Sequence, residues 1–452
     1  MTVPFNNKLP VQKRIFTNSL VGRIVRNSSY LLSATGISAG ISMIQSILAA
    51  RLLGVAGFGI LGAITMFTSV INKFASFRMS ELVVKYVGHF SEANDSQRAA
   101  AVFKVAALLE MLASIAAFGL VWFLAPLGAR YLAKDIATQP LFVLYGLILI
   151  ANLVSESSTG ILQIFDRFRF IAYINILQSM VTLAIIVFVY FSKGGLQGIL
   201  CAYLVGKAAS ALAISFVAML EAIRRWGWGW WKVQIKILIP QAKELGQFAL
   251  STNISASLSL INKDSELLWV SFLRNPVETG YYKLALTLAN LVQLPISPLP
   301  QATYPELSRE VARRNWTNVR YILRQGSYIA GGYTFVASLV LLLWGRSLIR
   351  YFYTPEYLPA FPALLILLTG FIIANTFYWN RTALLAIGRP DIPVKMNLIL
   401  AGLKVIGIIT LVPVYGYLAN AGLMSGSYII GVSISVIVFY LFLKKQEKLT
   451  QV

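Results

Sequence analysis

The chain has 452 residues, of which 57% are hydrophobic and only 12% charged, and its mean hydropathy is +0.70. This composition excludes a soluble globular protein and indicates an all-α polytopic membrane protein. Cys201 is the single cysteine and His89 the single histidine, which excludes an intrachain disulfide and a histidine metal cluster.

Twelve apolar segments are long enough to cross a bilayer as helices. They lie near residues 29–50, 54–76, 101–125, 140–162, 171–191, 196–219, 245–272, 281–303, 326–345, 359–386, 393–413 and 419–442. The first follows a basic tail, residues 1–28, without a small-residue cleavage site, so we expect an uncleaved span rather than a signal peptide. Because twelve is even, both termini are expected on one side.

The net charge of +22 could indicate nucleic-acid binding, but the distribution of the basic residues favours membrane topology instead. With the N-terminus inside, 28 of the 39 Lys and Arg residues fall in inner loops, tails and span ends, 8 fall outside and 3 lie within spans. The positive-inside rule therefore predicts that both termini are cytoplasmic. Attraction to anionic inner-leaflet lipids accounts for the same excess, so membrane lipids are expected partners and nucleic acid is not.

The first and fourth spans each carry a polar stripe at helical spacing. Ser38, Ser42 and Gln45 form the first, and the second includes Asn152, Glu156, Thr159 and Gln163. Ionisable groups inside a membrane are costly and often functional, so Glu156 is a candidate for proton or cation handling. A carboxyl hydrogen-bonded to Thr159 or Asn152 for packing is the alternative. Glu110 in the third span has no polar neighbours in sequence, which favours a structural role.

The longest stretch outside the spans, residues 221–243, contains four tryptophans interleaved with Arg and Lys. Such a segment could stack nucleic-acid bases, but in an inner membrane loop an interfacial anchor is favoured. We therefore predict a cytoplasmic linker between an N-terminal lobe, residues 29–220, and a C-terminal lobe, residues 244–443, which precedes a tail at 444–452.

The seventh span has the length of a membrane helix but is unusually polar. Asn253, Ser257 and Asp264 fall on one side of the predicted helix, while Glu266 falls on nearly the opposite side. We expect this helix to line a central cavity. Lys263 is expected to pair with Glu266 three residues away and to exchange it for a substrate phosphate, while Asp264 or Glu266 could serve a coupling ion. A salt bridge kept only for folding is the alternative.

The eighth span contains Pro295, Pro298 and Pro300 within six residues, which predicts a bent or broken helix. The break could be a hinge for alternating access or a static kink. Three further cations within spans are candidate ligands of a substrate phosphate. Arg381 in the tenth span could bind a phosphate with two hydrogen bonds, or it could instead extend its charged end to the membrane interface. Lys404 in the eleventh span and Lys207 in the sixth are comparable candidates.

The chain repeats itself weakly after the linker, at an offset of about 220 to 225 residues. Asn152 in Ile-Ala-Asn matches Asn375 in the same tripeptide, Asn175 matches Asn397, and Gly198 matches Gly422. Two six-span halves with the same direction through the membrane are related by an axis along its normal, which places the substrate at their interface.

Three short motifs follow the first, seventh and tenth spans. They are Ala50-Arg51-Leu52-Leu53-Gly54 followed by Gly57-Phe58-Gly59, then Gly280-Tyr281-Tyr282-Lys283-Leu284-Ala285, and Ala386-Ile387-Gly388-Arg389-Pro390. With these motifs the chain resembles the polysaccharide transporter branch of the multidrug/oligosaccharidyl-lipid/polysaccharide exporter superfamily. The resemblance implies a MATE-like fold of two six-helix lobes in a V around a central cavity, and alternating access coupled to an ion gradient of H⁺ or Na⁺.

The resemblance implies a flippase that moves a polyprenyl-pyrophosphate-linked oligosaccharide across the bacterial cytoplasmic membrane. Lys263, Arg381, Lys404 and Lys207 would supply cations for the pyrophosphate, and Asn253, Ser257 and Gln45 would suit sugar hydroxyls. A drug or cation antiporter of the same fold is the main alternative. A membrane polymerase or ligase is disfavoured because the outer connections are short and the sequence shows no nucleophile-base pair, phosphate-binding Gly loop or metal-ligand cluster; no cofactor is expected.

Overall fold

The computed structural model describes residues 20–76, 78–259 and 265–450, and these residues form helices joined by short turns, with no strand among them. Eight of the described helical segments are long and apolar enough to cross a membrane. Two of the eight each contain two spans, because a glycine with positive φ interrupts them: Gly54 (φ 64°) and Gly416 (φ 67°). An L side chain rarely adopts such φ values, so glycine permits the chain to reverse there.

The N-terminal lobe contains six membrane-crossing passes in the order of the sequence. They are built from α2 (Leu20–Ala75, two passes), α3 (Met79–Glu92), α4 (Ser96–Leu127), η1 (Gly128–Ala133), η2 (Ile136–Thr138), α5 (Gln139–Ala151), α6 (Ser155–Ile164), α7 (Phe168–Phe191) and α8 (Gly195–Trp226). The short helices η3 (Trp230–Lys232) and η4 (Ile235–Gln241) follow in the predicted linker.

The C-terminal lobe repeats this order. Its elements are α9 (Ala242–Ser259), α10 (Glu266–Leu273), α11 (Pro276–Gln293), α12 (Leu299–Ala312), α13 (Trp316–Leu348), η6 (Ile349–Tyr353), η7 (Pro355–Tyr357), α14 (Ala360–Thr376), α15 (Asn380–Ala386) and α16 (Asp391–Thr450, two passes). The all-α architecture of two six-helix lobes is therefore confirmed.

Three spans are divided, and only the division of the eighth was predicted. The fourth breaks after Asn152 and the tenth after Thr376, next to Asn375, so the matched asparagines mark equivalent breaks in the two lobes. The eighth breaks between Gln293 and Leu299, among the prolines, as predicted from their missing amide donors. Whether this last break acts as a hinge stays a prediction.

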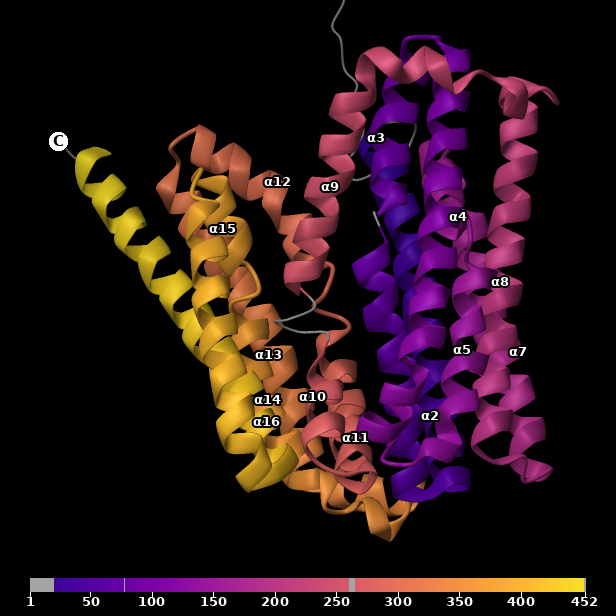
Figure 1. The fold of residues 1–452 in the computed structure, drawn as a ribbon. Coiled ribbons are helices and arrows are strands. Elements are labelled where there is room, and N and C mark those ends of the chain that lie inside the picture. The colour runs from indigo at the N-terminus through magenta and orange to yellow at the C-terminus, as the bar shows by residue number, and fades with distance from the viewer. Residues whose placement is uncertain (1–19, 77, 260–264, 451–452) are drawn as a thin grey trace, which may run out of the picture.

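The two lobes lie together at the lower end of Figure 1 and diverge toward the upper end, where the linker crosses. At the lower end α2 and α11 touch backbone to backbone: a Cβ on Gly59 would lie 1.9 Å from the Pro276 carbonyl oxygen, and one on Gly280 would lie 2.2 Å from that of Val55. Small residues at Gly59 and Gly280 therefore permit this close contact between the lobes.

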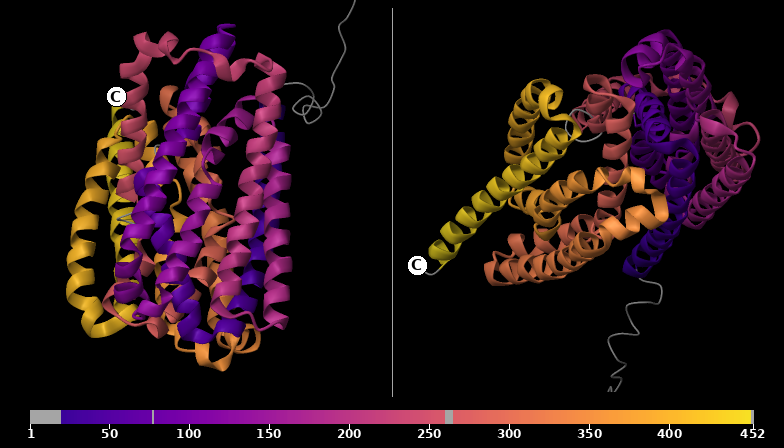
Figure 2. Two further views of the ribbon diagram at one scale, coloured as in Figure 1. Left: turned by 45° about the vertical axis from the view of Figure 1, so that its right-hand side comes forward. Right: turned by 90° about the horizontal axis from the view of Figure 1, so that it is seen from below.

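At the other extreme, the right-hand view of Figure 2, seen from below, places the C-terminal part of α16 at the edge farthest from the N-terminal lobe.

Helix α9 lies against the N-terminal lobe, although the sequence assigned it to the C-terminal one (Figure 1). The Asn253 side-chain amide donates to the carbonyl oxygens of Phe74 (3.2 Å) and Ser76. Near the start of α9, the Tyr86 hydroxyl on α3 donates to the Glu244 carboxylate at 2.8 Å. The predicted lobe boundary at residue 244 stays a prediction, because α9 connects both halves.

Candidate functional site

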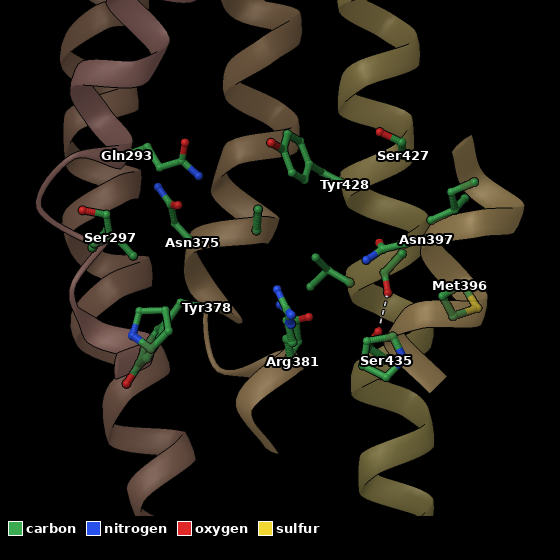
Figure 3. A pocket seen from close by; sticks show the side chains of 18 residues that line it. Gln293, Ser297, Asn375, Tyr378, Arg381, Met396, Asn397, Ser427, Tyr428 and Ser435 are labelled. Atoms are coloured by element: carbon green, nitrogen blue, oxygen red, sulfur yellow. Dashed lines mark hydrogen bonds between the residues drawn. The ribbon is translucent and has the colours of Figure 1, made fainter. Parts of the chain in front are cut away.

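A pocket of about 300 Å³ opens inside the C-terminal lobe, between the α11–α12 break, the α14–α15 break and the two halves of α16. Helix breaks leave backbone groups and polar side chains free to face a pocket, which is where irregular backbone is tolerated at membrane depth. The polar residues that line it are Gln293, Ser297, Asn375, Tyr378, Asn380, Arg381, Asn397, Ser427, Tyr428 and Ser435. Figure 3 shows Arg381 at the centre, between Tyr378 and Ser435.

Two hydrogen-bond donors in this pocket have no partner among the described residues. The Asn375 side chain is only 2% exposed, yet its amide nitrogen makes no hydrogen bond. Arg381 forms no ion pair with any described residue, and no Asp or Glu lines the pocket. The pocket is therefore cationic and rich in donors, which suits an anion with hydroxyl groups around it.

The prolines predicted as a hinge lie beside this pocket. Pro300 lines it together with Ile296 and Ser297 from the turn that joins α11 to α12. Movement of that turn would change the pocket wall opposite Arg381. The structure thus brings one predicted phosphate ligand and one predicted hinge residue into a single site.

Glu266 and Lys404, two further predicted site residues, form a buried ion pair at a different place in the C-terminal lobe. Both are almost fully buried, at 3% and 5% exposure. The second Glu266 oxygen accepts hydrogen bonds from the Tyr282 hydroxyl (3.2 Å) and the Asn420 amide (2.9 Å). The cluster ties α10 and α11 to both halves of α16.

The expected partner of Glu266 was Lys263, which lies outside the described residues together with Asp264. In the described part of the chain Glu266 instead pairs with Lys404, 138 residues away in sequence. A charge so deeply buried needs an opposite charge and hydrogen bonds, and this cluster supplies both. The arrangement suits the structural alternative for Glu266, while roles of Lys404 in substrate binding and of Glu266 in ion coupling stay predictions.

A second polar pocket, of about 170 Å³, lies in the N-terminal lobe at the α5–α6 break. It is lined by Asn72, Ser76, Glu110, Ala113, Ser114, Asn152, Ser155 and Glu156. Glu156 accepts hydrogen bonds from the Ser76 hydroxyl (2.9 Å) and the Met79 amide (3.1 Å), rather than from Thr159 or Asn152. It therefore joins α6 to the turn between α2 and α3.

Glu110 has apolar neighbours in sequence, but in the structure it contacts polar groups of a distant helix, α6. Its carboxylate accepts from the backbone amides of Glu156 (2.7 Å) and Ser157 (2.8 Å), and from the Ser157 hydroxyl (2.6 Å). These amides belong to the first turn of α6 and have no partner within that helix. Glu110 thus satisfies the free N-terminus of a helix that begins inside the membrane, and its negative charge complements the helix dipole.

The remaining predicted site residues are scattered. The Gln45 amide donates to the Ser179 carbonyl oxygen (2.8 Å), which joins α2 to α7 inside the N-terminal lobe. Lys207 is exposed on α8. Asn253 binds the end of α2, as described above, and the side chain of Ser257 lies outside the described part of the structure.

A set of interlobe contacts at the lower end of Figure 1 was not predicted as functional. The Arg51 guanidinium donates to the carbonyl oxygens of Tyr351 and Phe352, at 2.6 Å for Phe352. Lys283 donates to the Phe58 carbonyl oxygen (3.2 Å), and the Tyr357 hydroxyl to that of Ala50 (3.0 Å). Arg51, Phe58 and Lys283 all belong to the motifs quoted above, so these motifs were the feature of the sequence that could have indicated the contacts.

At the same end, Arg274 follows α10 and pairs with Glu278 on α11 at 2.8 Å. This hydrogen bond raises the pKa of Arg274 above its ordinary value, so the guanidinium stays charged. Arg274 also donates to the Pro413 carbonyl oxygen at 2.7 Å, next to the reversal at Gly416. The pair thus fixes the lower ends of α10, α11 and α16 to one another.

The fold is similar to those of several solved transporters. An inward-facing multidrug resistance MATE family transporter of the MOP superfamily superposes with a TM-score of 0.71 at 14% identity, covering 91% of this chain and 96% of that one. The lipid II flippase MurJ, in an inward closed conformation, also gives 0.71, at 18% identity over 90% of this chain and 87% of MurJ. A MOP superfamily transporter from Pyrococcus furiosus, described as having a binding pocket of reverse polarity, superposes with a TM-score of 0.65 at 15% identity, covering 97% of this chain and 98% of that one.

The two-lobed fold and the family matches define a membrane transporter of the multidrug/oligosaccharidyl-lipid/polysaccharide exporter superfamily. Within it, the chain belongs to the family described as polysaccharide biosynthesis protein, whose model matches residues 24–310. The MatE family model matches residues 267–410. The inner membrane protein YghQ of Escherichia coli K12 is 26% identical over 350 residues, which cover 77% of this chain and 98% of YghQ.

Proposed function

We propose that this transporter moves a polyprenyl-pyrophosphate-linked oligosaccharide from the inner to the outer leaflet of the bacterial cytoplasmic membrane, for the synthesis of a surface polysaccharide. The observation that carries the proposal is the C-terminal pocket, where Arg381 and the buried Asn375 amide present donors without a described partner. Membership in a polysaccharide biosynthesis family and the match to an inner membrane protein support the same function and location.

The charge of the pocket favours this substrate over the cationic drug of the alternative hypothesis. A guanidinium stays charged at any physiological pH and can hold two phosphate oxygens at once. A cationic drug would be repelled by Arg381, and the pocket lining has no carboxylate to offset that repulsion. Asn375, Asn397 and Gln293 would bind sugar hydroxyls beside the pyrophosphate.

The polyprenyl tail requires an apolar surface close to the polar pocket. A pocket of about 270 Å³ with an almost wholly apolar lining lies between Met43 of α2 and the C-terminal lobe helices α11 and α13. Leu291 and Val292 line this apolar pocket, and the next residue, Gln293, lines the polar one. The two pockets therefore share the end of α11, as an amphipathic lipid-linked substrate would require.

The positive-inside rule places the linker, and the end at which the lobes diverge, in the cytoplasm. The contacts made by Arg51, Lys283 and Tyr357 would then close the outer end, and the structure would correspond to an inward-open state that loads substrate from the inner leaflet. Alternating access would break these contacts, with the turn around Pro295, Pro298 and Pro300 as the hinge.

A coupling cation, H⁺ or Na⁺, would bind in the N-terminal pocket at Glu156. Glu110 shares that pocket, and the Ser114 hydroxyl, with the residue only 8% exposed, faces it without a described partner. Occupation would alter the hydrogen bonds through which Glu156 holds the turn between α2 and α3. Asp264, outside the described residues, is a second candidate for the same role.

Binding of a short-chain polyprenyl pyrophosphate disaccharide to the purified transporter tests the proposal. Arg381→Gln should weaken binding roughly tenfold or more, since a hydrogen bond to a charged group contributes about 1.5–3 kcal/mol. Arg350→Gln is the matched control, because Arg350 is also exposed and has no described partner but lies in η6, away from the pocket. Equal affinities for the two variants, or preferential binding of a cationic dye by the wild type, would refute the proposal.

A further inference from the structure

The linker between the lobes is folded onto α4 rather than free. Trp230 is 8% exposed, and its ring packs on Phe103 with 5.2 Å between ring centroids. Lys104, the next residue on α4, donates to the Val233 carbonyl oxygen at 3.0 Å. These contacts fix the chain at the point where it turns from α8 toward α9.

An apolar pocket of about 220 Å³ lies directly after this anchor, and no residue that lines it has a polar side chain. One wall comes from α3 and α4 and the other from η4 and the start of α9. The lining residues are Leu82, Val102, Val105, Ala106, Leu109, Ile235, Leu238, Ile239, Ala242, Leu245, Gly246 and Ala249. Such a pocket has no donor or acceptor side chain for a headgroup or a sugar, so its natural content is hydrocarbon.

The wall formed by η4 and the start of α9 carries two lysines next to residues that line the pocket, and we take them as its rim. Lys236 follows Ile235 and Lys243 follows Ala242, and both lysines are exposed, with no described polar partner. Glu244, the acid of the same segment, is engaged with Tyr86 at 2.8 Å and with Lys85 at 3.9 Å. The rim is therefore left with unneutralised positive charge.

Exposed tryptophans indicate the depth at which this region lies in the membrane. Trp228 is 83% exposed and Trp231 is 55% exposed, and Lys232 lies over the Trp231 ring at 5.4 Å. Tryptophan rings with neighbouring cations are typical of the headgroup level of a bilayer. An apolar pocket at that level can receive an acyl chain while the headgroup remains at the rim.

We propose that this pocket binds one acyl chain of an anionic phospholipid, whose headgroup phosphate pairs with Lys236 and Lys243. The apolar lining selects a lipid chain, and the basic rim selects an anionic headgroup over a zwitterionic one. Because α9 forms one wall and also binds the end of α2 through Asn253, the lipid would hold the interlobe connection against the N-terminal lobe. This site is separate from the substrate pocket and does not depend on the proposed function.

The test compares retention of phosphatidylglycerol and phosphatidylcholine by the purified full-length transporter, with native mass spectrometry of protein taken from mixed vesicles. The wild type should retain one phosphatidylglycerol in preference to phosphatidylcholine. Lys236→Gln together with Lys243→Gln should reduce that preference roughly tenfold or more, since each lysine near a lipid surface contributes about 1 kcal/mol. Lys444→Gln with Lys445→Gln is the matched control on α16 and should leave the preference unchanged.

Gly246→Trp tests the contribution of the apolar pocket to lipid binding separately from that of the lysine charges. A Cβ on Gly246 meets no atom within 4 Å, so a larger side chain can enter the pocket without displacing the backbone. This variant should lose both lipids while its unfolding midpoint stays that of the wild type. Equal retention of the two lipids by the wild type, an unchanged preference in the Lys236 and Lys243 variant, or displacement of phosphatidylglycerol by a polyprenyl phosphate would overturn the proposal.

Discussion

Replacement of Lys404 by Met should destabilise the protein because it leaves the buried Glu266 carboxylate without its cation. Both residues are almost fully buried, and removal of one partner from a buried pair costs about 3–5 kcal/mol. Glu266 would keep its hydrogen bonds from Tyr282 and Asn420, so we expect the free energy of unfolding to fall by about 3 kcal/mol, the smallest value of that range. Met preserves the length and most of the volume of the lysine stem.

The double variant Lys404→Met, Glu266→Gln should recover most of this loss. A neutral glutamine keeps an acceptor for Tyr282 or Asn420 without a buried charge, so we expect a residual cost of about 1 kcal/mol. Lys395→Met on the same helix is the control: its ion pair with Asp391 spans 3.9 Å and Lys395 is 74% exposed, which predicts a change within about 0.5 kcal/mol.

The assay is equilibrium unfolding in mixed detergent micelles, followed by tryptophan fluorescence. A double variant that is about 2 kcal/mol more stable than Lys404→Met alone would support the cluster as a structural ion pair. The reasoning is refuted if Lys404→Met unfolds with the wild-type midpoint, or if the double variant is less stable than Lys404→Met alone.

Three other changes test further contacts. Gly59→Ala would place its Cβ 1.9 Å from the Pro276 carbonyl oxygen and should separate the lobes at the Arg51 end, measured as a longer spin-label distance, whereas Gly36→Ala meets nothing within 4 Å and should not. Arg51→Gln should increase thiol labelling of a cysteine placed at that end; unchanged labelling would exclude a closing role. Glu110→Ala leaves α6 amides without an acceptor and should lower the free energy of unfolding by about 2 kcal/mol or more, with wild-type stability as the contrary result.

Much of the fold follows from the sequence because membrane helices are defined by local composition. The apolar lengths predict the passes, the prolines predict the break between Gln293 and Leu299, and the repeat predicts equivalent lobes. The breaks after Asn152 and Thr376 contain no proline and were not predicted. They depend on tertiary partners, such as the Glu110 carboxylate, which replaces the lost helical acceptors for the first amides of α6.

The candidate sites were predicted only in part because polar pairing in a bundle is set by distant helices. The sequence selected Arg381 as a candidate phosphate ligand, because a charge within a span needs polar surroundings; the structure places it in a polar pocket, and its role as a ligand stays a prediction. It paired Glu266 with Lys263 by helical spacing, but Lys404 comes from the opposite end of the lobe sequence. Arg51 lies in a quoted motif, yet its partners, the carbonyl groups of η6, carry no residue-specific signal in the sequence.

The central claim is most directly tested by translocation in proteoliposomes. A fluorescent polyprenyl-pyrophosphate oligosaccharide, placed in both leaflets, is bleached from outside by an impermeant reductant. The account predicts that wild-type transporter makes the whole lipid pool accessible, that Arg381→Gln slows this roughly tenfold or more, and that Arg350→Gln does not. Transfer by the wild type no faster than in protein-free liposomes, or equal rates for Arg381→Gln and the wild type, would contradict it.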